Sequence, residues 1–348
     1  MNKPEVTLRL PAEWEDCFGA VMVAWPHEDT DWAPMLGAVR ETYRSLIARL
    51  IEAGQRVLVV TPDAAATLDS LHDIDHSAVM VAEVPTNDTW TRDYGPISVE
   101  VNGRIVLHDF KFNAWGLKFA ADRDNLVNQR LTDNGSLRCD LNNCLDFVLE
   151  GGSIESDGRG TLLTTTECLS SPNRNGAMTI PEIEDYLKST LGVSRVLWLD
   201  YGALDGDDTD SHIDTLARFA PCDTILYCGA GDEDTPQAAG LRRMAAQLAT
   251  LTTPEGRPYN LVELPLPDAI YDEDGNRLPA TYANFLVTSE AVIMPVYGQM
   301  RKDYLASQIL KIAFPEHRIL TVDCRTLIRQ HGSLHCATMQ ISRNILPI

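Results

Sequence analysis

The residues best suited to chemistry are a cysteine near the C-terminus and a histidine–aspartate pair near the middle of the chain. Cys336 ends the motif Gly-Ser-Leu-His-Cys, and His212 and Asp214 form a His-x-Asp motif. A thiolate can attack an electrophilic carbon, and an imidazole can carry the protons that such a reaction moves. On a strand, residues two positions apart point to the same face. We therefore predict a cysteine nucleophile served by a histidine acid/base, with Asp214 on the same face as His212.

A second motif predicts the kind of substrate. Trp-Thr-Arg-Asp at 90–93 supplies an aromatic ring, Trp90, and a carboxylate, Asp93. Together with Asp214, Asp93 can clamp a planar guanidinium, and Trp90 could stack on the same cation. Attack of the Cys336 thiolate on the central guanidinium carbon would expel ammonia and leave a covalent thiouronium. Water deprotonated by His212 would then release a urea product, so the pattern indicates hydrolysis of a guanidine.

Each of these residues also has an ordinary structural interpretation. Any one cysteine or histidine is by default a core residue, and Asp93 could pair with its neighbour Arg92. We favour the chemical interpretation because the residue types complement one another. On a strand, His335 would face away from its neighbour Cys336, so we predict a structural role for it. Asn284 either hydrogen-bonds the substrate or satisfies backbone groups where a strand begins, and both alternatives stay open.

The elements that must position these residues repeat one order along the chain: hairpin, helix, strand. Expected hairpins begin near 97, 153, 213, 282 and 335, in steps of 56, 60, 69 and 53 residues. Such a period is typical of repeat architectures. The last repeat can be completed only by the N-terminus, which predicts a closed ring. A single open mixed α/β sheet remains the alternative.

The expected elements follow from hydrophobic periodicity and turn signals such as Asn102-Gly103. The strands are 20–25, 56–60, 97–101, 105–109, 145–149, 153–156, 161–166, 195–199, 213–219, 224–228, 260–264, 282–287, 291–295, 318–323 and 335–341. The helices are 35–53, 123–131, 181–191, 237–251 and 302–314. We expect one domain, 1–348, with modules of about 97–150, 151–210, 211–280, 281–330, and 331–348 plus 1–96. Most of the candidate catalytic and binding residues lie where hairpins begin. In a closed ring, these equivalent positions would all face one central axis.

Composition narrows the class of partner. The 348 residues include 29 Lys and Arg and 50 Asp and Glu, a formal charge of −21. We therefore expect a small cationic guanidine substrate, no nucleic acid and no membrane, and leave a homo-oligomer open. No apolar stretch approaches the roughly 20 residues of a membrane span. The first residues, 1–5, lack signal-peptide features, so we expect a cytoplasmic protein with mostly reduced cysteines. None of the eight cysteines forms Cys-x-x-Cys, which argues against structural zinc.

Seven motifs together resemble the agmatine deiminase and bacterial peptidyl-arginine deiminase family of the guanidino-group-modifying, or pentein, superfamily. In chain order they are Pro-Ala-Glu-Trp-Glu (11–15), Trp-Pro (25–26), Trp-Thr-Arg-Asp-Tyr-Gly-Pro (90–96), Glu-Gly-Gly (150–152), Asp208 through Asp214, Tyr-Ala-Asn-Phe (282–285) and Gly-Ser-Leu-His-Cys (332–336). Each motif alone is weak, but their joint order over nearly the whole chain is specific.

The resemblance implies a fold, a reaction and a set of site residues. The fold is a five-bladed α/β propeller of ββαβ modules with pseudo-fivefold symmetry, whose last module is closed by both termini. The reaction is hydrolysis of agmatine to N-carbamoylputrescine and ammonia, with no metal and no organic cofactor. By matching position, the resemblance implies a nucleophile, Cys336; an acid/base, His212; a guanidinium clamp, Asp93 and Asp214; a pocket wall, Trp90; a pocket-lining residue, Glu150; and a second ligand for the cation, Asp208.

Two departures from the family pattern leave the substrate open. Ser211 stands where the family usually has glycine before the histidine, and His331-Gly332-Ser333 replaces a glycine-rich run. Deimination of free or peptidyl arginine and amidino transfer to an amine remain alternatives. So do a thiol protease and a non-catalytic polyamine-binding protein.

Overall fold

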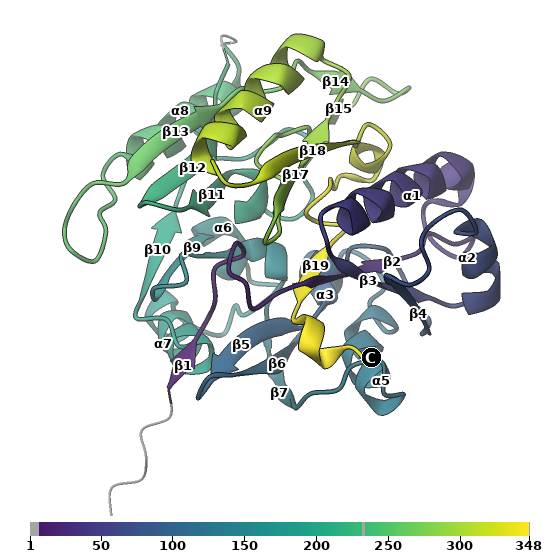
Figure 1. Cartoon of the computed structure of the whole chain (residues 1–348). Helices are drawn as coiled ribbons and strands as arrows, with labels where there is room; N and C mark the ends of the chain where they lie inside the picture. Colours follow the sequence, from purple (N-terminus) through teal and green to yellow (C-terminus); the bar gives the residue numbers. More distant parts are fainter. Residues whose placement is uncertain (1–6, 232–233, 348) are drawn as a thin grey trace, which may run out of the picture.

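The structure, a computed structural model, describes residues 7–231 and 234–347. It is an α/β fold of small sheets, with α1, α5, α7, α8 and α9 toward the outside and β19 and α3 near the middle (Figure 1). The segment 1–5, which the cytoplasmic expectation used, lies outside the described residues. None of the described helices is long and apolar enough to cross a bilayer.

Five sheets repeat one strand order. Their strands are β1 (Leu8–Arg9), β5 (Ile97–Val101), β6 (Arg104–Lys111) and β7 (Leu141–Val148); β8 (Ile154–Ser156), β9 (Thr161–Thr165) and β10 (Arg195–Leu199); β11 (Ala217–Ala220), β12 (Thr224–Cys228) and β13 (Asn260–Leu264); β16 (Leu286–Val287), β17 (Ala291–Val296) and β18 (Arg318–Asp323); and β19 (Met339–Ile341), β2 (Ala20–Ala24), β3 (Arg56–Thr61) and β4 (Val79–Glu83). Each sheet contains an antiparallel pair followed by a parallel pair. The predicted repeat of hairpin, helix and strand is therefore confirmed.

Helices cover these sheets, and a separate ribbon pairs β14 (Ile270–Tyr271) with β15 (Arg277–Leu278). The α-helices are α1 (Leu36–Glu52), α2 (Ala64–Ser70), α3 (Thr91–Tyr94), α4 (Ala114–Leu117), α5 (Val127–Asp133), α6 (Thr166–Leu169), α7 (Ile180–Leu191), α8 (Pro236–Leu248) and α9 (Met300–Ala313). The 3-10 helices are η1 (Ala33–Met35), η2 (Asp124–Leu126), η3 (Gly151–Ser153), η4 (Ile213–Thr215), η5 (Leu327–Gln330) and η6 (Arg343–Ile345).

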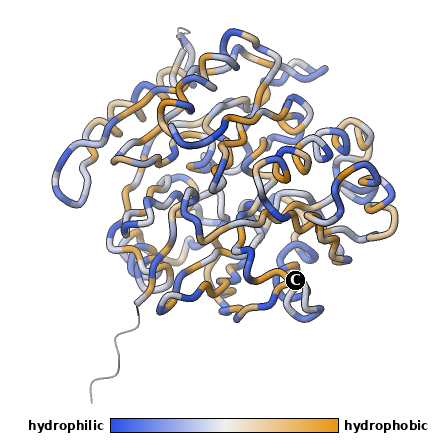
Figure 2. Tube along the Cα trace, viewed as in Figure 1, coloured by the Kyte–Doolittle hydropathy of each residue, from blue (hydrophilic) through white to orange (hydrophobic). Residues whose placement is uncertain are grey.

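Local sequence signals explain where elements begin and end. Asn102 and Gly103 both have positive φ, 50° and 77°, as the two-residue turn between β5 and β6 requires. Thr179 and Glu182 form a capping box at the start of α7, and Gly192 ends it with a φ of 70°. Each turn of α1 contains both hydrophobic and hydrophilic residues (Figure 2), and the buried residues recur every three or four positions, so that one face of the helix is buried.

Three predicted strands are shorter by three or more residues in the structure. The prediction for 213–219 is wrong at its start, because 213–215 form η4 and only Ala217–Ala220 are β11. Likewise, 282–287 reduces to β16 and 335–341 to β19. Buried 3-10 turns and extended loops carry the same run of apolar residues as a strand, and periodicity alone does not separate them.

The two ends of the chain meet in one sheet. β19, from the C-terminal end, pairs antiparallel with β2, from the N-terminal end, in the register Met339↔Met22. Arg56 Nη2 also donates to the carbonyl of Pro347 at 2.9 Å. The predicted meeting of the two ends of the chain is therefore observed, and it places the loop of Cys336, which precedes β19, beside β2.

A buried arginine, Arg218 on β11, joins several modules. Its Nε donates to Glu155 on β8 at 2.8 Å, and its Nη2 donates to Glu13 of the N-terminal segment at 3.1 Å. Its guanidinium carbon lies 4.7 Å from the centre of the Phe285 ring. Only 1% of the Arg218 side chain is exposed. A charge buried so deeply depends on its partners, so these contacts couple the positions of distant segments.

Replacing Arg218 should test this coupling. Arg218→Met should lower the free energy of unfolding by about 3–5 kcal/mol, because Glu13 and Glu155 lose their buried cation. Denaturant unfolding measures the change. Arg257→Met is the matched control: the Arg257 side chain is 66% exposed beside Asp223, so its loss should cost less than about 1 kcal/mol. Equal stability of the two variants would contradict a coupling role for Arg218.

Candidate active site

Cys336 lies in the loop between η5 and β19 and is 4% exposed. The amide oxygen of Asn284 accepts hydrogen bonds from the backbone N–H groups of His335 at 2.9 Å and of Cys336 at 3.3 Å. Its Nδ2 lies 3.3 Å from the Cys336 sulfur. Asn284 thus satisfies backbone groups, one of the two predicted alternatives, and it also contacts the thiol.

Asp214 lies beside the same sulfur and is oriented by His335. Its Oδ2 is 3.9 Å from Cys336 Sγ and 2.7 Å from His335 Nδ1. His335 Nε2 is in turn 2.7 Å from Glu13 Oε2. Among the described residues, nothing hydrogen-bonds to the buried Oδ1 of Asp214. One oxygen of Asp214 is therefore held in place, and the other is available to accept an N–H group from a bound cation.

His212 faces the second predicted clamp residue. Its Nδ1 lies 3.6 Å from Asp93 Oδ1, and the ring is fully buried. The Asp93 carboxylate accepts hydrogen bonds from the backbone N–H of Gly152 at 3.1 Å and from Trp115 Nε1 at 2.9 Å. It does not take up the alternative pairing with Arg92, whose Nη2 is 3.6 Å from Glu13 instead.

Gly152 in η3 marks the point where these groups converge. A β-carbon there would lie 2.6 Å from His212 Nδ1, 2.8 Å from Asp93 Oδ1 and 3.1 Å from Asp214 Oδ2. Glycine alone leaves the imidazole and both carboxylates room to meet. Because Asp214 also contacts the sulfur of Cys336, all four predicted catalytic residues lie in one site.

The argument that placed His212 and Asp214 on one face of a strand is wrong. His212 immediately precedes η4, and Asp214 lies within that 3-10 turn. They reach the same site because the turn presents His212 to Asp93 and Asp214 to His335. A tight turn, rather than strand alternation, thus sets their geometry.

Both sequence departures from the family pattern fall at left-handed backbone positions. Ser211 has a φ of 63° and His331 a φ of 66°, a region that favours glycine. Ser211 is held there by a backbone hydrogen bond to Asp207 at 2.8 Å and by a side-chain hydrogen bond to Glu167 at 2.9 Å. His331 Nδ1 lies 2.7 Å from the carbonyl oxygen of Gly206. Side-chain contacts therefore fix conformations for which glycine would be the usual residue.

A cavity with aromatic and acidic walls leads to Cys336. Its lining includes Trp90 and Trp115, and the carboxylates Asp31, Asp88, Asp93 and Asp208. Trp90 packs directly over Gly332, where a β-carbon would come 2.3 Å from the ring. Among the described residues that line this cavity, none is lysine or arginine. The structure thus places Trp90 and Asp208 where a substrate of Cys336 would pass.

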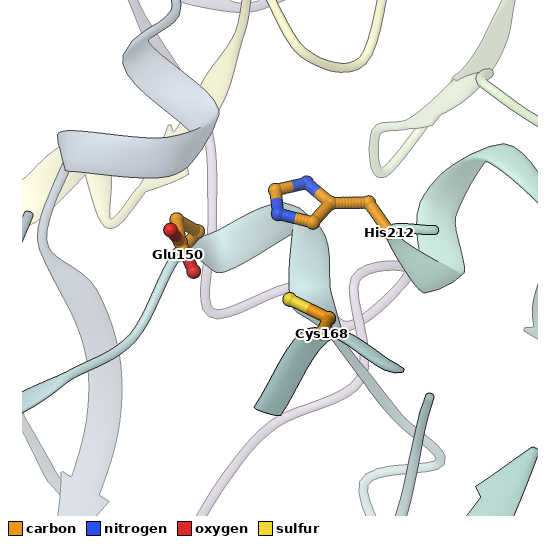
Figure 3. A group of neighbouring side chains, drawn as sticks. All are labelled: Glu150, Cys168 and His212. Carbon is orange, nitrogen blue, oxygen red and sulfur yellow. The ribbon is translucent and has the colours of Figure 1, made fainter. Parts of the chain in front are cut away.

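Glu150 lies behind this cavity rather than in its wall. It is fully buried, and Arg174 Nε lies 2.9 and 3.0 Å from its two carboxylate oxygens. Its charge is therefore compensated inside the protein, and its role as a pocket-lining residue stays a prediction. Glu150 instead joins Cys168 and His212 in a buried group whose ligand atoms all lie within 4.8 Å of one another (Figure 3).

The thiol and the imidazole have opposite electrostatic surroundings. Burial raises the pKa of the Cys336 thiol well above its ordinary value, and the charges of Asp214 and Asp93 raise it further. Burial lowers the pKa of His212, but the nearby Asp93 carboxylate and other neighbours outweigh it, and the pKa lies well above its ordinary value. Both shifts favour the protonated forms of the thiol and of the imidazole in the free protein.

The clamp carboxylates differ from one another. Burial raises the pKa of Asp93 to about 6, with a further contribution from the charge of Asp214. Burial also acts to raise the pKa of Asp214, but the hydrogen bond from His335 outweighs it and the pKa is lowered. At the cavity wall, burial and the charges of Asp31 and Asp208 raise the pKa of Asp88 to about 7. A bound cation would relieve the repulsion among these acids.

Sequence reasoning missed several residues of the site. Trp115 holds Asp93, Arg174 compensates Glu150, and Cys168 lies beside His212. None belongs to a motif used for the prediction, and their contacts depend on distant segments. Asp88, by contrast, lies two residues before Trp90, and an acid so close to that motif was a usable signal.

Comparisons with known proteins agree with this geometry. The family model described as Porphyromonas-type peptidyl-arginine deiminase matches residues 9–342. A Vibrio parahaemolyticus protein provisionally named agmatine deiminase is 34% identical, over 95% of this chain and 96% of its own.

Two solved structures are similar over almost their full length. A Porphyromonas gingivalis protein provisionally named arginine deiminase has a TM-score of 0.92 at 45% identity, covering 98% of this chain and 100% of its own. An agmatine deiminase variant of C. jejuni, solved with substrate bound, has a TM-score of 0.91 at 36% identity, covering 99% and 98%. With its imidazole and paired carboxylates gathered around Gly152 and its thiol beside Asp214, the chain belongs to the Porphyromonas-type peptidyl-arginine deiminase family, which here includes relatives named agmatine deiminase.

Proposed function

We propose that the protein hydrolyses agmatine to N-carbamoylputrescine and ammonia through a covalent amidino intermediate on Cys336. The observation that carries the proposal is the cavity of Cys336, which has four aspartates and no lysine or arginine among its described lining residues. Agmatine has a guanidinium at one end and an ammonium at the other. A site acidic along its length suits a substrate that is cationic at both ends.

The two clamp residues would hold the guanidinium over the sulfur. Asp214 Oδ1 is buried and unpartnered among the described residues, and Asp93 lines the cavity from the other side. Two carboxylates can each accept N–H groups from one planar guanidinium. Trp90 and Trp115 would confine the flat cation, since their rings form the cavity wall.

The reaction then forms and breaks a C–S bond, replaces a C–N bond by a C–O bond, and needs three proton transfers. The Cys336 thiolate attacks the central guanidinium carbon and forms a C–S bond. The tetrahedral adduct breaks a C–N bond, and the leaving nitrogen takes a proton from His212 and departs as ammonia. Neutral His212 then removes a proton from water, the hydroxide adds to the thiouronium carbon, and the C–S bond breaks. The added hydroxyl group gives its proton to the departing ammonia or to solvent, the urea product leaves, and the thiolate is restored.

Substrate binding supplies the thiolate in this scheme. Asp93 and Asp214 disfavour a negative sulfur in the free protein, and both raise the pKa of Cys336. A guanidinium between them replaces that repulsion by attraction. The thiol then loses its proton at a lower pH in the complex than in the free protein, so the nucleophile forms mainly when its target is present.

Arginine is the second candidate, because the P. gingivalis relative at 45% identity carries that name. Its α-carboxylate would have to lie near Asp88 and Asp208, which also line the cavity. Lys118, a cation beside Asp208, donates to the Asp208 carbonyl and pairs with Asp210 at 2.7 Å. The acidic outer wall therefore favours agmatine over arginine.

We also propose that the five modules are the blades of a five-bladed α/β propeller. The shared strand order of the five sheets and the pairing of β19 with β2 support this arrangement. Gathering residues from 93 to 336 in one site is what equivalent loops around a common axis would achieve.

The covalent intermediate can be trapped. Protein quenched in acid during turnover of agmatine should carry an amidino group on the peptide that contains Cys336, as seen by mass spectrometry. Cys336→Ser should show neither adduct nor turnover, while its melting temperature stays close to wild type. An adduct on another cysteine, or turnover by Cys336→Ser, would refute the proposed nucleophile.

Alkylation reports the protonation state of the thiol. Because only the thiolate reacts, and the pKa of Cys336 is raised, iodoacetamide modification of the free protein should keep accelerating with pH beyond pH 9. The rate is measured from intact protein mass, with Cys336→Ser subtracting the other thiols. A plateau already reached at neutral pH would show that the thiolate exists without substrate.

The acidic wall can be tested with matched substrates. Asp88→Asn and Asp208→Asn should each raise KM for agmatine about tenfold, equivalent to about 1.4 kcal/mol. Neither should alter kinetics with butylguanidine, which lacks the terminal ammonium. Asp205→Asn, outside this cavity, is the control variant. Faster turnover of arginine or of an arginyl peptide than of agmatine would overturn the substrate assignment, and a new guanidine formed with an added amine would indicate amidino transfer.

A further inference from the structure

We propose that Glu150, Cys168 and His212 form an inhibitory binding site for a borderline-soft divalent cation such as Zn²⁺. The three side chains come from three separate segments: Glu150 immediately precedes η3, Cys168 lies in α6, and His212 immediately precedes η4. Figure 3 shows them pointing toward a common space, with the carboxylate and the sulfur on the same side of the imidazole. One carboxylate, one thiol and one imidazole are the ligand types that zinc takes in proteins.

The donor atoms are close enough for a single ion. All three lie within 4.8 Å of one another, and each residue is fully buried. Zinc bonds sulfur at ~2.3 Å and nitrogen or oxygen at ~2.0–2.2 Å, which puts tetrahedral donors roughly 3.5 Å apart. Side-chain movements of about 1 Å would therefore close the site around the ion, with water as the fourth ligand.

A second observation points to a ligand at the same place. Although the ring of His212 is fully buried, neither ring nitrogen makes a hydrogen bond of ordinary geometry in the part of the chain that the structure describes, and its polar neighbours include the Asp93 carboxylate and the Cys168 thiol. Buried polar atoms are almost always satisfied. Nδ1 faces Asp93 at 3.6 Å, and the opposite edge of the ring faces Glu150 and Cys168 in Figure 3.

The surroundings also fit a bound cation. Arg174 holds Glu150 through one Nε, and a carboxylate retains lone pairs for a metal when it accepts such a bond. Hydrogen bonds of this kind orient ligating carboxylates in metal sites. When zinc binds, the Cys168 thiol and the His212 imidazole would each release a proton to solvent, and thiolate and carboxylate together would offset the charge of the ion.

The access route explains why the site would inhibit. Asp93 lines the cavity of Cys336 and lies 3.6 Å from His212, so a cation would arrive by the path that the substrate uses. An ion held there would occupy His212, which must carry protons in the reaction. The inhibitory consequence rests on the proposed function, whereas the binding itself does not.

Cobalt binding tests the site without turnover. Co²⁺ added to Cys336→Ser should produce a sulfur-to-cobalt charge-transfer absorption, because Cys168 remains. The absorption should persist in Cys336→Ser/Cys144→Ser, where a buried thiol of another sheet is removed, and vanish in Cys336→Ser/Cys168→Ser. Absorption that survives loss of Cys168, or absence of absorption in Cys336→Ser at millimolar Co²⁺, would overturn the proposal. Far-ultraviolet circular dichroism of each variant confirms that it is folded.

Zinc inhibition tests the consequence. Zn²⁺ should inhibit agmatine hydrolysis mainly by lowering kcat, and Cys168→Ser should need at least about tenfold more zinc, a loss typical of damaged metal sites. Cys144→Ser should respond as wild type does. Unchanged zinc sensitivity in Cys168→Ser would assign inhibition to Cys336 and refute the inhibitory role. If the protein does not hydrolyse agmatine at all, the cobalt experiment still decides whether the site binds metal.

Discussion

The site depends on a network of buried charges behind the reactive cysteine. Glu13, Arg218 and His335 are all nearly inaccessible, and they contact one another at 2.7 to 3.2 Å. His335 Nδ1 also lies 2.7 Å from Asp214 Oδ2, so the same network fixes the position of that carboxylate. Charges removed from water are tolerated only with well-placed partners, so each segment that contributes a charge is fixed relative to the others. The need to pair these buried charges therefore positions the carboxylate of Asp214.

Three side chains of the site also come together at one glycine, Gly152. The imidazole of His212 and the carboxylates of Asp93 and Asp214 would all lie within 3.1 Å of a β-carbon at this position. They can approach so closely because the glycine in η3 presents only backbone to them. The same backbone donates its N–H to Asp93, so the residue that makes room also orients one clamp group.

Asp93 and Asp214, the two proposed clamp residues, would act both on the substrate and on the Cys336 thiol. They attract a planar cation, and in its absence they raise the pKa of the Cys336 thiol. A thiol kept protonated in the free protein is protected from oxidation and alkylation, since the thiolate is the reactive form. In the proposed reaction the guanidinium both occupies the clamp and favours the nucleophile. The negative charges of Asp93 and Asp214 would then determine both which substrate binds and when the Cys336 thiolate forms.

The sequence by itself determined the order of elements and supplied the prediction of which groups react. Hairpin turns, caps and hydrophobic alternation are local properties, and motifs such as Gly-Ser-Leu-His-Cys name Cys336 without a structure. Tertiary structure decided how the groups meet. It placed His212 and Asp214 at a 3-10 turn, moved Glu150 behind the cavity onto Arg174, and brought Trp115 and Cys168 to the site. These contacts join segments far apart in the chain, where the free energy of pairing buried charges and filling space sets positions that no local pattern encodes.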